Sequence, residues 1–165
     1  MYELFDHTAD LGIRIHAKDL PSLFEEAGRA LFSVLVENLE LVELKEAHAI
    51  HLQGDRLEYL FFDWLNQLLY LFDAKRLLLA GFQVSVEEYS PNSSGRGHEV
   101  FATSRESQGE KTRENRGWRL EAEVRGERLD WRRHKLDHEI KAITYHGLRV
   151  EQTSEGWLAE VIVDI

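Results

Sequence analysis

A short polar cluster near the start of the chain has the residue types of a cation site or of an acid–base site. Asp6, His7 and Asp10 stand within a few positions of one another. Carboxylate oxygens are ligands for hard divalent cations, and an imidazole beside them can transfer a proton. The same region can also be a simple turn, because Asp side chains hydrogen-bond to their own backbone. The cluster alone leaves both interpretations open.

A second acidic group stands at the other end of the sequence. The apolar run at 161–163 leads directly into Asp164, and Ile165 follows with a terminal carboxylate. If Asp10 lies nearby in the fold, three carboxylates converge, which is unfavourable without a cation or a protonated member. The alternative is a final edge strand whose end is solvated.

A lysine precedes an extended segment that could bring it to the same place. In a strand that includes residues 141–146, Lys141, Ile143 and Tyr145 project to one face, and Thr144 and His146 to the other. The Lys141 ammonium could then approach the carboxylates or pair with a partner's phosphate or acidic group. A strand lysine with its charged head in water is the alternative.

The remaining histidines do not form a recognisable site. His48 and His51 fall on opposite faces of their expected strand, so they cannot share a metal ion there. His134 and His138 have the spacing of a helical metal pair, but the sequence around them favours a polar strand or a turn. There is no glycine-rich phosphate loop and no nucleophile elbow. The sequence offers no complete catalytic constellation.

The charge balance bears on the kind of partner. Twenty Lys and Arg residues against thirty Asp and Glu residues give a formal net charge of −10. Such a surface repels nucleic acid at long range, because phosphate binding needs a basic face. We therefore expect contacts with cations or with a basic protein partner. Direct sequence-specific RNA binding is disfavoured, with a local basic patch as the alternative.

The composition also bears on cellular location. The chain has no cysteine, and its first residues lack the basic and apolar regions of a signal peptide. The longest apolar stretch, 59–71, is too short to span a membrane and contains polar residues. We expect a cytoplasmic protein with no membrane partner.

Hydrophobic periodicity predicts the elements that must position these groups. Residues 11–17 alternate as in a half-buried strand. Ser22 and Glu25 have the spacing of a capping box and predict a helix over 22–36. A strand is expected at 46–53. A second helix is expected to begin near Asp55 with the apolar residues Leu57, Leu60, Phe61, Trp64, Leu65, Leu68, Leu69 and Phe72.

From residue 76 onward the alternation is mainly that of strands, and the element order predicts the fold class. We expect an α+β fold: a single two-layer domain over residues 1–165, with a mixed or mainly antiparallel sheet and two amphipathic helices on one face. The polar stretch 89–117 interrupts this pattern. We interpret it as a mobile surface insertion between two strands.

Three strings together resemble signatures of the archease family. The Asp6–Asp10 string matches its N-terminal signature, the string 141–146 (Lys-Ala-Ile-Thr-Tyr-His) matches a later one, and Val163-Asp164-Ile165 matches its C-terminal ending. The second helix, with Phe61-Phe62-Asp63-Trp64-Leu65, also resembles the family. The stretch 89–117 is longer and more polar than its counterpart in archeases, which puts its role in doubt.

The resemblance implies a specific role for the chain. It implies an archease-like fold and a protein that is not an enzyme but a cofactor of an RtcB-type RNA-splicing ligase. Archeases promote guanylylation of the ligase histidine and multiple turnover, in tRNA splicing and RNA repair. RNA and GTP would be met only through the ligase, in a transient complex.

The resemblance also assigns residues. It implies a divalent metal ion bound by oxygen ligands, Ca²⁺ first with Mg²⁺ or Mn²⁺ as alternatives, held by Asp10, Asp164 and the terminal carboxylate of Ile165. Asp10, Lys141 and Asp164 would carry the activation. Asp6 and His7 would have supporting roles.

Two other functions remain as alternatives. A chaperone-like protein-binding module would need no metal and would be insensitive to changes at Asp10 or Asp164. A metal-dependent hydrolase of phosphate esters would use the carboxylates to hold Mg²⁺. It ranks last, because the sequence has no nucleophile or phosphate-binding loop to support it.

Overall fold

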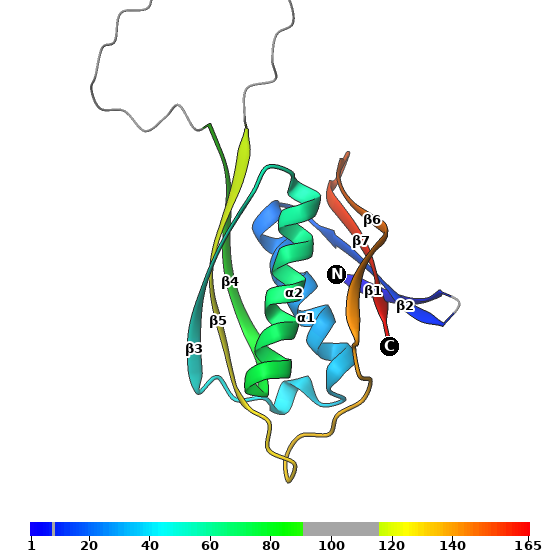
Figure 1. The fold of residues 1–165 in the computed structure, drawn as a ribbon, viewed down its shortest axis with the longest axis vertical. Coiled ribbons are helices and arrows are strands. Elements are labelled where there is room, and N and C mark those ends of the chain that lie inside the picture. Colours follow the sequence, from blue (N-terminus) through cyan, green and yellow to red (C-terminus); the bar gives the residue numbers. More distant parts are fainter. Residues whose placement is uncertain (8, 91–115) are drawn as a thin grey trace, which may run out of the picture.

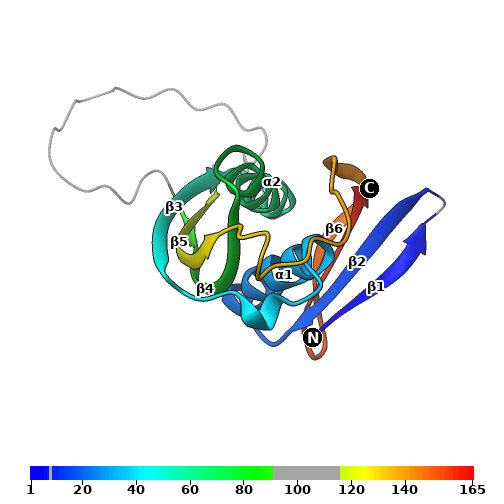
Figure 2. The same cartoon turned by 90° about the horizontal axis from the view of Figure 1, so that it is seen from below.

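Two antiparallel sheets enclose two helices in the computed structural model, which describes residues 1–7, 9–90 and 116–165 (Figures 1 and 2). One sheet has the strand order β1 (Tyr2–His7), β2 (Asp10–Ala17), β7 (Gly156–Asp164), β6 (Ala142–Thr153). The other has the order β3 (Glu46–Gly54), β5 (Gly117–Arg128), β4 (Leu77–Tyr89). The helices are α1 (Leu20–Leu35) and α2 (Leu57–Lys75), and a short 3₁₀ helix, η1, spans Leu39–Leu41. Among these described helices, none has the length and apolar character needed to cross a membrane.

The α+β class, the antiparallel pairing and the two helices of the expected fold are confirmed. The layering differs from the expected one, because the strands form two sheets that lie on opposite sides of the helices (Figure 2). Helix α1 packs on β4 on one side and on β2 on the other, and α2 packs on β6 and on β3. The buried residues of α2 explain this arrangement. They extend around the helix beyond the width of a single stripe, and a helix that is apolar on two sides must be covered on both.

The start of α1 is capped differently from the sequence prediction. The Asp19 carboxylate accepts a hydrogen bond from the Ser22 backbone N–H at 2.8 Å, and hydrogen bonding to Ser22 lowers the pKa of Asp19. The predicted capping box of Ser22 and Glu25 is therefore wrong. Glu25 instead accepts a hydrogen bond from the backbone N–H of Val84 on β4, at 3.1 Å. A helix side chain thus fixes the helix to the three-stranded sheet.

The centre of the core is aromatic. Trp64 of α2 is fully buried and donates its indole N–H to the carbonyl oxygen of Phe24 on α1, at 2.9 Å. The Trp64 ring also lies edge-on to Phe82 of β4. Both helices and the three-stranded sheet are therefore held at fixed relative positions beneath the four-stranded sheet.

The stretch 89–117 joins two paired strands, as predicted. Tyr89 at the end of β4 lies opposite Gly117 at the start of β5. Residues 91–115 lie outside the described residues, so the expectation that this stretch is a mobile insertion stays a prediction.

Candidate functional site

A row of directly opposed residues crosses the end of the four-stranded sheet. His7 of β1 lies opposite Asp10 of β2, Asp10 lies opposite Asp164 of β7, and Asp164 lies opposite Ala142 of β6. Opposed residues in an antiparallel pair project to the same face of the sheet. Residues of alternate parity, such as Ile13, are buried in the core, so the row lies on the face that points away from the helices.

Neither carboxylate of the row pairs with a lysine or an arginine among the described residues. Asp10 lies near the imidazole of His7, with 3.8 Å between Oδ2 and Nδ1, and Asp164 makes no ion pair with any described residue. The Nδ1 atom of His7 is buried and has no hydrogen-bond partner there. Like charges placed directly opposite each other on a sheet destabilise it. An added cation would relieve that repulsion.

The donor set for a hard cation is present but small. Among residues 1–7, 9–90 and 116–165, no three His, Asp or Glu side chains come close enough together to hold a metal ion. Asp10 and Asp164 supply oxygen donors of the type that Ca²⁺ and Mg²⁺ prefer. Further oxygens would have to come from the backbone, from the Ile165 carboxylate, from water or from a partner.

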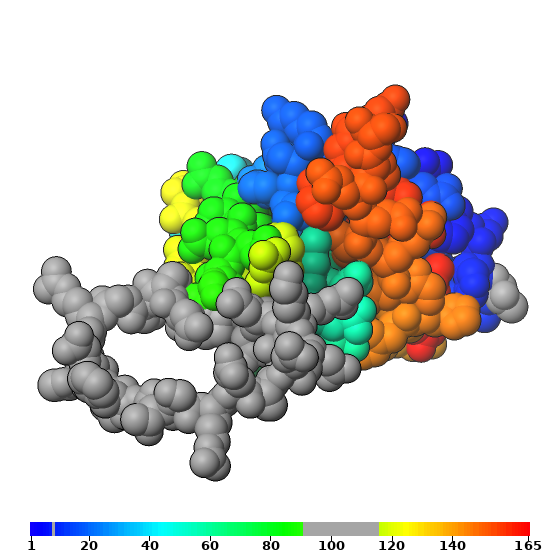
Figure 3. Space-filling model, turned by 90° about the horizontal axis from the view of Figure 1, so that it is seen from above, coloured from blue at the N-terminus to red at the C-terminus, as the bar shows by residue number. Residues whose placement is uncertain are grey.

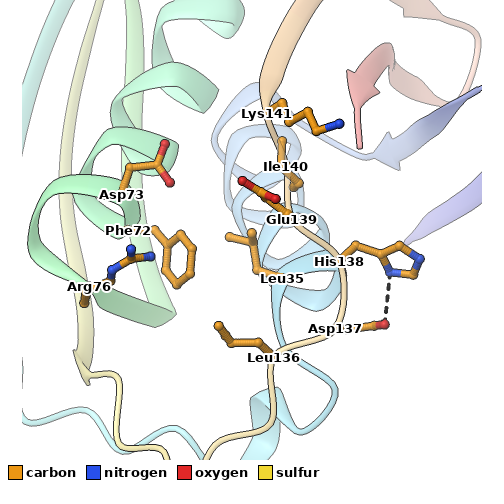
Figure 4. A pocket seen from close by; sticks show the side chains of 10 residues that line it. All are labelled: Leu35, Phe72, Asp73, Arg76, Leu136, Asp137, His138, Glu139, Ile140 and Lys141. Carbon is orange, nitrogen blue, oxygen red and sulfur yellow. Dashed lines mark ion pairs between the residues drawn. The ribbon is translucent and has the colours of Figure 1, made fainter.

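Lys141 is attached to the row through its backbone. Its N–H donates a hydrogen bond to the carbonyl oxygen of Asp164 at 2.8 Å. Its exposed side chain runs toward the end of β7 in Figure 4 and makes no ion pair among the described residues. The backbone of Lys141 is therefore joined to the acidic row, and the expected approach of its ammonium to the carboxylates stays a prediction.

Asp6 lies apart from the other predicted residues. It is opposite Leu11 in the sheet, which places its side chain on the other face from His7 and Asp10. It is exposed near the tip of the β1–β2 hairpin. The structure thus brings together His7, Asp10, Asp164 and the backbone of Lys141, but not the Asp6 side chain, and Ile165 packs partly buried against the core.

A wide bulge in β6 adds residues to the site that the sequence analysis did not place there. Thr144 pairs with Ile162 and Arg149 pairs with Glu160, so residues 145–148 lie opposite Val161 alone. Gly147 makes this possible, because its φ of 65° is a conformation that residues with a Cβ rarely adopt. Because the bulged residues are not paired one by one with β7, their side chains can contact other elements.

The bulge sends two side chains in different directions. The His146 ring lies 5.3 Å from the ring of His7, centroid to centroid, beside the row. The Tyr145 ring stacks on Phe62 of α2 at 3.8 Å and is half exposed. In Figure 3 the orange atoms of β6 lie beside the teal atoms around the start of α2. The sequence analysis had placed Tyr145 and His146 on opposite faces of a strand, and their side chains do point to different neighbours.

A ladder of charges stabilises the same face of the sheet next to the row. Glu160 on β7 pairs with Arg14 of β2 at 2.6 Å and with Arg149 of β6 at 3.0 Å. Hydrogen bonds from Arg149 and Arg14 lower the pKa of Glu160. The two arginines are committed to Glu160, so they are not placed to neutralise the carboxylates of the row.

A buried polar cluster elsewhere was missed by the sequence analysis. The Glu127 carboxylate accepts hydrogen bonds from the Arg133 guanidinium and from the Glu43 backbone N–H. His134, whose side chain is fully buried, accepts from the Asp130 N–H through Nδ1 and places Nε2 3.0 Å from Glu127. Burial favours the neutral form of Glu127, but the hydrogen bonds and charges outweigh it and lower its pKa. We interpret the cluster as structural, because all its members are held by one another.

Comparison with known proteins shows the same resemblance along the whole chain. The model of the Archease protein family (MTH1598/TM1083) matches residues 2–165. Proteins named "Protein archease" from Pyrococcus abyssi and Methanosarcina barkeri are 33% and 32% identical to it. Each match covers 99% of this chain, and 98% and 95% of the respective relative. The solution structure of Methanobacterium thermoautotrophicum protein 1598 superposes with a TM-score of 0.72 at 25% identity and covers 99% of this chain and 98% of that one.

Proposed function

The chain belongs to the archease family, and on this premise we propose that it activates an RtcB-type RNA-splicing ligase. In this proposal it is a protein cofactor, without a reaction of its own, that promotes guanylylation of the ligase and its multiple turnover in tRNA splicing and RNA repair. The observation that carries the proposal is the direct pairing of Asp10 with Asp164 on the outer face of the sheet. Two carboxylates without a lysine or arginine partner, at an accessible end of the sheet, are suited to hold a cation at the catalytic centre of a ligase that acts on phosphates.

We assign the individual roles as follows. Asp10 and Asp164, with the terminal carboxylate of Ile165, would hold a divalent cation, Ca²⁺ first and Mg²⁺ or Mn²⁺ as alternatives. Bound there, the cation would supply positive charge toward phosphate oxygens. Lys141 would add an ammonium beside it, and His7 would orient the Asp10 carboxylate that it contacts. A supporting role for Asp6 would lie at the hairpin tip, since its side chain is on the other face.

The proposal predicts that the wild-type protein stimulates its cognate ligase. Guanylylation and ligation by that ligase are measured under single-turnover and multiple-turnover conditions, with and without the protein. We expect faster guanylylation in both regimes and continued ligation beyond the first turnover. No effect on the cognate ligase would reject the proposal and favour a general protein-binding module.

Metal binding is predicted independently of the ligase. Calorimetric titration of Ca²⁺ into the isolated protein is expected to give saturable binding that is lost in Asp10→Asn, because one of two side-chain donors is removed. Asp137→Asn, at an exposed carboxylate that pairs with His138, is the matched control and should bind as the wild type does. Equal Ca²⁺ affinity in Asp10→Asn and wild type would contradict the metal assignment.

A further inference from the structure

A pocket of about 620 Å³ opens between the C-terminal ends of the two helices and the segment that leads into β6 (Figure 4). Its apolar lining comes from Leu35 of α1, Phe72 of α2 and Ile140, all of which are buried residues of the core. Pockets that bind ligands have volumes in this range. Apart from Leu136, the rest of this lining is polar and mostly charged, which suits a charged ligand group. The pocket is separate from the acidic row.

Two carboxylates face the pocket without a partner. Asp73 of α2 and Glu139 of the segment before β6 lie on its two sides and point toward each other in Figure 4. Neither forms an ion pair with any described residue. Asp137, in contrast, is 3.1 Å from His138. The pocket therefore has two free negative charges above an apolar floor.

Two cationic side chains already line the pocket, Lys141 and Arg76, and Arg76 lies to one side. The Arg76 guanidinium is 5.5 Å from the centroid of the Phe72 ring. Figure 4 shows it on one side of Phe72, with Leu35 and Glu139 on the other. The side of the ring that faces Leu35 is thus left for an incoming group.

We propose that this pocket receives a lysine or arginine side chain of a partner protein. The aliphatic stem of such a side chain would lie on Phe72 and Leu35, and its charged head would lie between Asp73 and Glu139. Long basic side chains combine these two properties, an apolar stem and a cationic head. The net charge of −10 favours the approach of a basic partner surface over the whole molecule.

Naming the partner as the ligase rests on the proposed function. A protein that binds RNA must present lysine and arginine around its RNA path, because phosphate contacts dominate such affinity. Although separate, the pocket is adjacent to the acidic row, since Lys141 lines it and donates its backbone N–H to Asp164. A basic side chain seated here would fix the orientation in which the row meets the ligase.

The first test uses a small probe and no ligase. N-acetyl-arginine methylamide is titrated into the ¹⁵N-labelled protein, and the uncharged citrulline analogue is titrated as the control. We expect weak, saturable binding, with a Kd on the order of millimolar for so small a ligand. The shifted amides should be confined to the pocket lining, at Leu35, 72–76 and 136–141. Shifts spread over the acidic surface, or equal shifts with the citrulline probe, would overturn the proposal.

Three variants should change the affinity for the arginine probe in two different directions. Asp73→Asn and Glu139→Gln should each weaken binding of the arginine probe about two- to fivefold, as expected for one exposed ion pair. Arg76→Gln should strengthen it, because a like charge is removed. Glu88→Gln, at an exposed carboxylate near the far end of β4, is the control and should leave the Kd unchanged. A Kd that is unaffected by both Asp73→Asn and Glu139→Gln would reject the pocket as the binding site.

The second test separates this inference from the proposed function. With the ligase, the double variant Asp73→Asn/Glu139→Gln should raise the concentration of protein needed for half-maximal stimulation and leave the maximum unchanged. An unchanged half-maximal concentration would overturn the assignment of the ligase as partner. If the wild-type protein gives no stimulation at all, the proposed function fails, and the probe titration still decides whether the pocket binds a basic side chain.

Discussion

Replacing Asp164 by Asn is expected to abolish the stimulation of ligase guanylylation without unfolding the protein. The side chain projects from the end of the central strand β7 to the outer face, where it lies opposite Asp10. Asn has nearly the same shape, so the pairing of β7 with its neighbours is preserved. The charge that would bind a cation is lost. The measurement is the rate of ligase guanylylation at saturating variant, compared with the ligase alone.

The thermal stability of Asp164→Asn gives a second, independent test of the same site. Because Asp10 and Asp164 repel each other, removing one charge should leave the unfolding midpoint unchanged or slightly higher. Glu155→Gln, in the turn at the other end of β7, is the matched control and should stimulate the ligase as the wild type does. Full stimulation by folded Asp164→Asn would show that the row does not carry the activity.

The largest loss of stability is expected for Glu127→Ala. This change leaves the Glu43 N–H and the Arg133 guanidinium without their acceptor, removes the carboxylate beside the buried His134 ring, and creates a cavity behind β5. Removing one partner of such a buried polar network should lower the free energy of unfolding by about 2–4 kcal/mol. Urea denaturation followed by tryptophan fluorescence measures this difference. Glu123→Ala, at an exposed position on the same strand, should cost much less.

The pH dependence of this cluster has a definite sign. Since the pKa of Glu127 is lowered in the folded protein, its charge stabilises the fold fully above the unfolded pKa of about 4.3. That contribution is lost as the pH falls through the folded value. Glu127→Gln should therefore be less stable than wild type at pH 7 and nearly equal to it at acidic pH. A difference that stays constant down to pH 3 would contradict the role of the charge.

Much of the fold follows from local pattern. The alternation at 46–53 and the apolar spacing of α2 correspond to observed elements, because both depend on residues close in sequence. Strand β1 was not predicted, since its side chains are largely exposed and Leu4 is 44% exposed. Its extension depends on pairing with β2. The two-sheet layering likewise depends on how far the apolar surface of the helices extends, which a single periodicity does not report.

Only part of the candidate site could be predicted from the sequence. Asp10, Asp164 and Lys141 were candidates from their residue types and positions, and the family resemblance assigned their roles. The pairing of β2 with β7 and the Lys141 N–H bond to Asp164 then bring their backbones together at one end of the sheet. Sequence spacing does not indicate that Asp6 faces away from them, because its direction depends on the register of the unpredicted strand β1. The pocket and the Glu127 cluster were not predicted either. Both are formed by side chains from separate segments, whose approach no sequence spacing encodes.

The strand order of the four-stranded sheet limits when that sheet can form during synthesis. Strand β7 lies between β2 and β6 and pairs with both, although it follows every other strand along the chain. During translation, β3, β4, β5 and both helices leave the ribosome earlier and can associate while β1 and β2 wait as a separate hairpin. The pairing of Asp10 with Asp164 therefore requires the last strand to be synthesised, as does the part of the core that Ala159, Val161 and Val163 of β7 contribute.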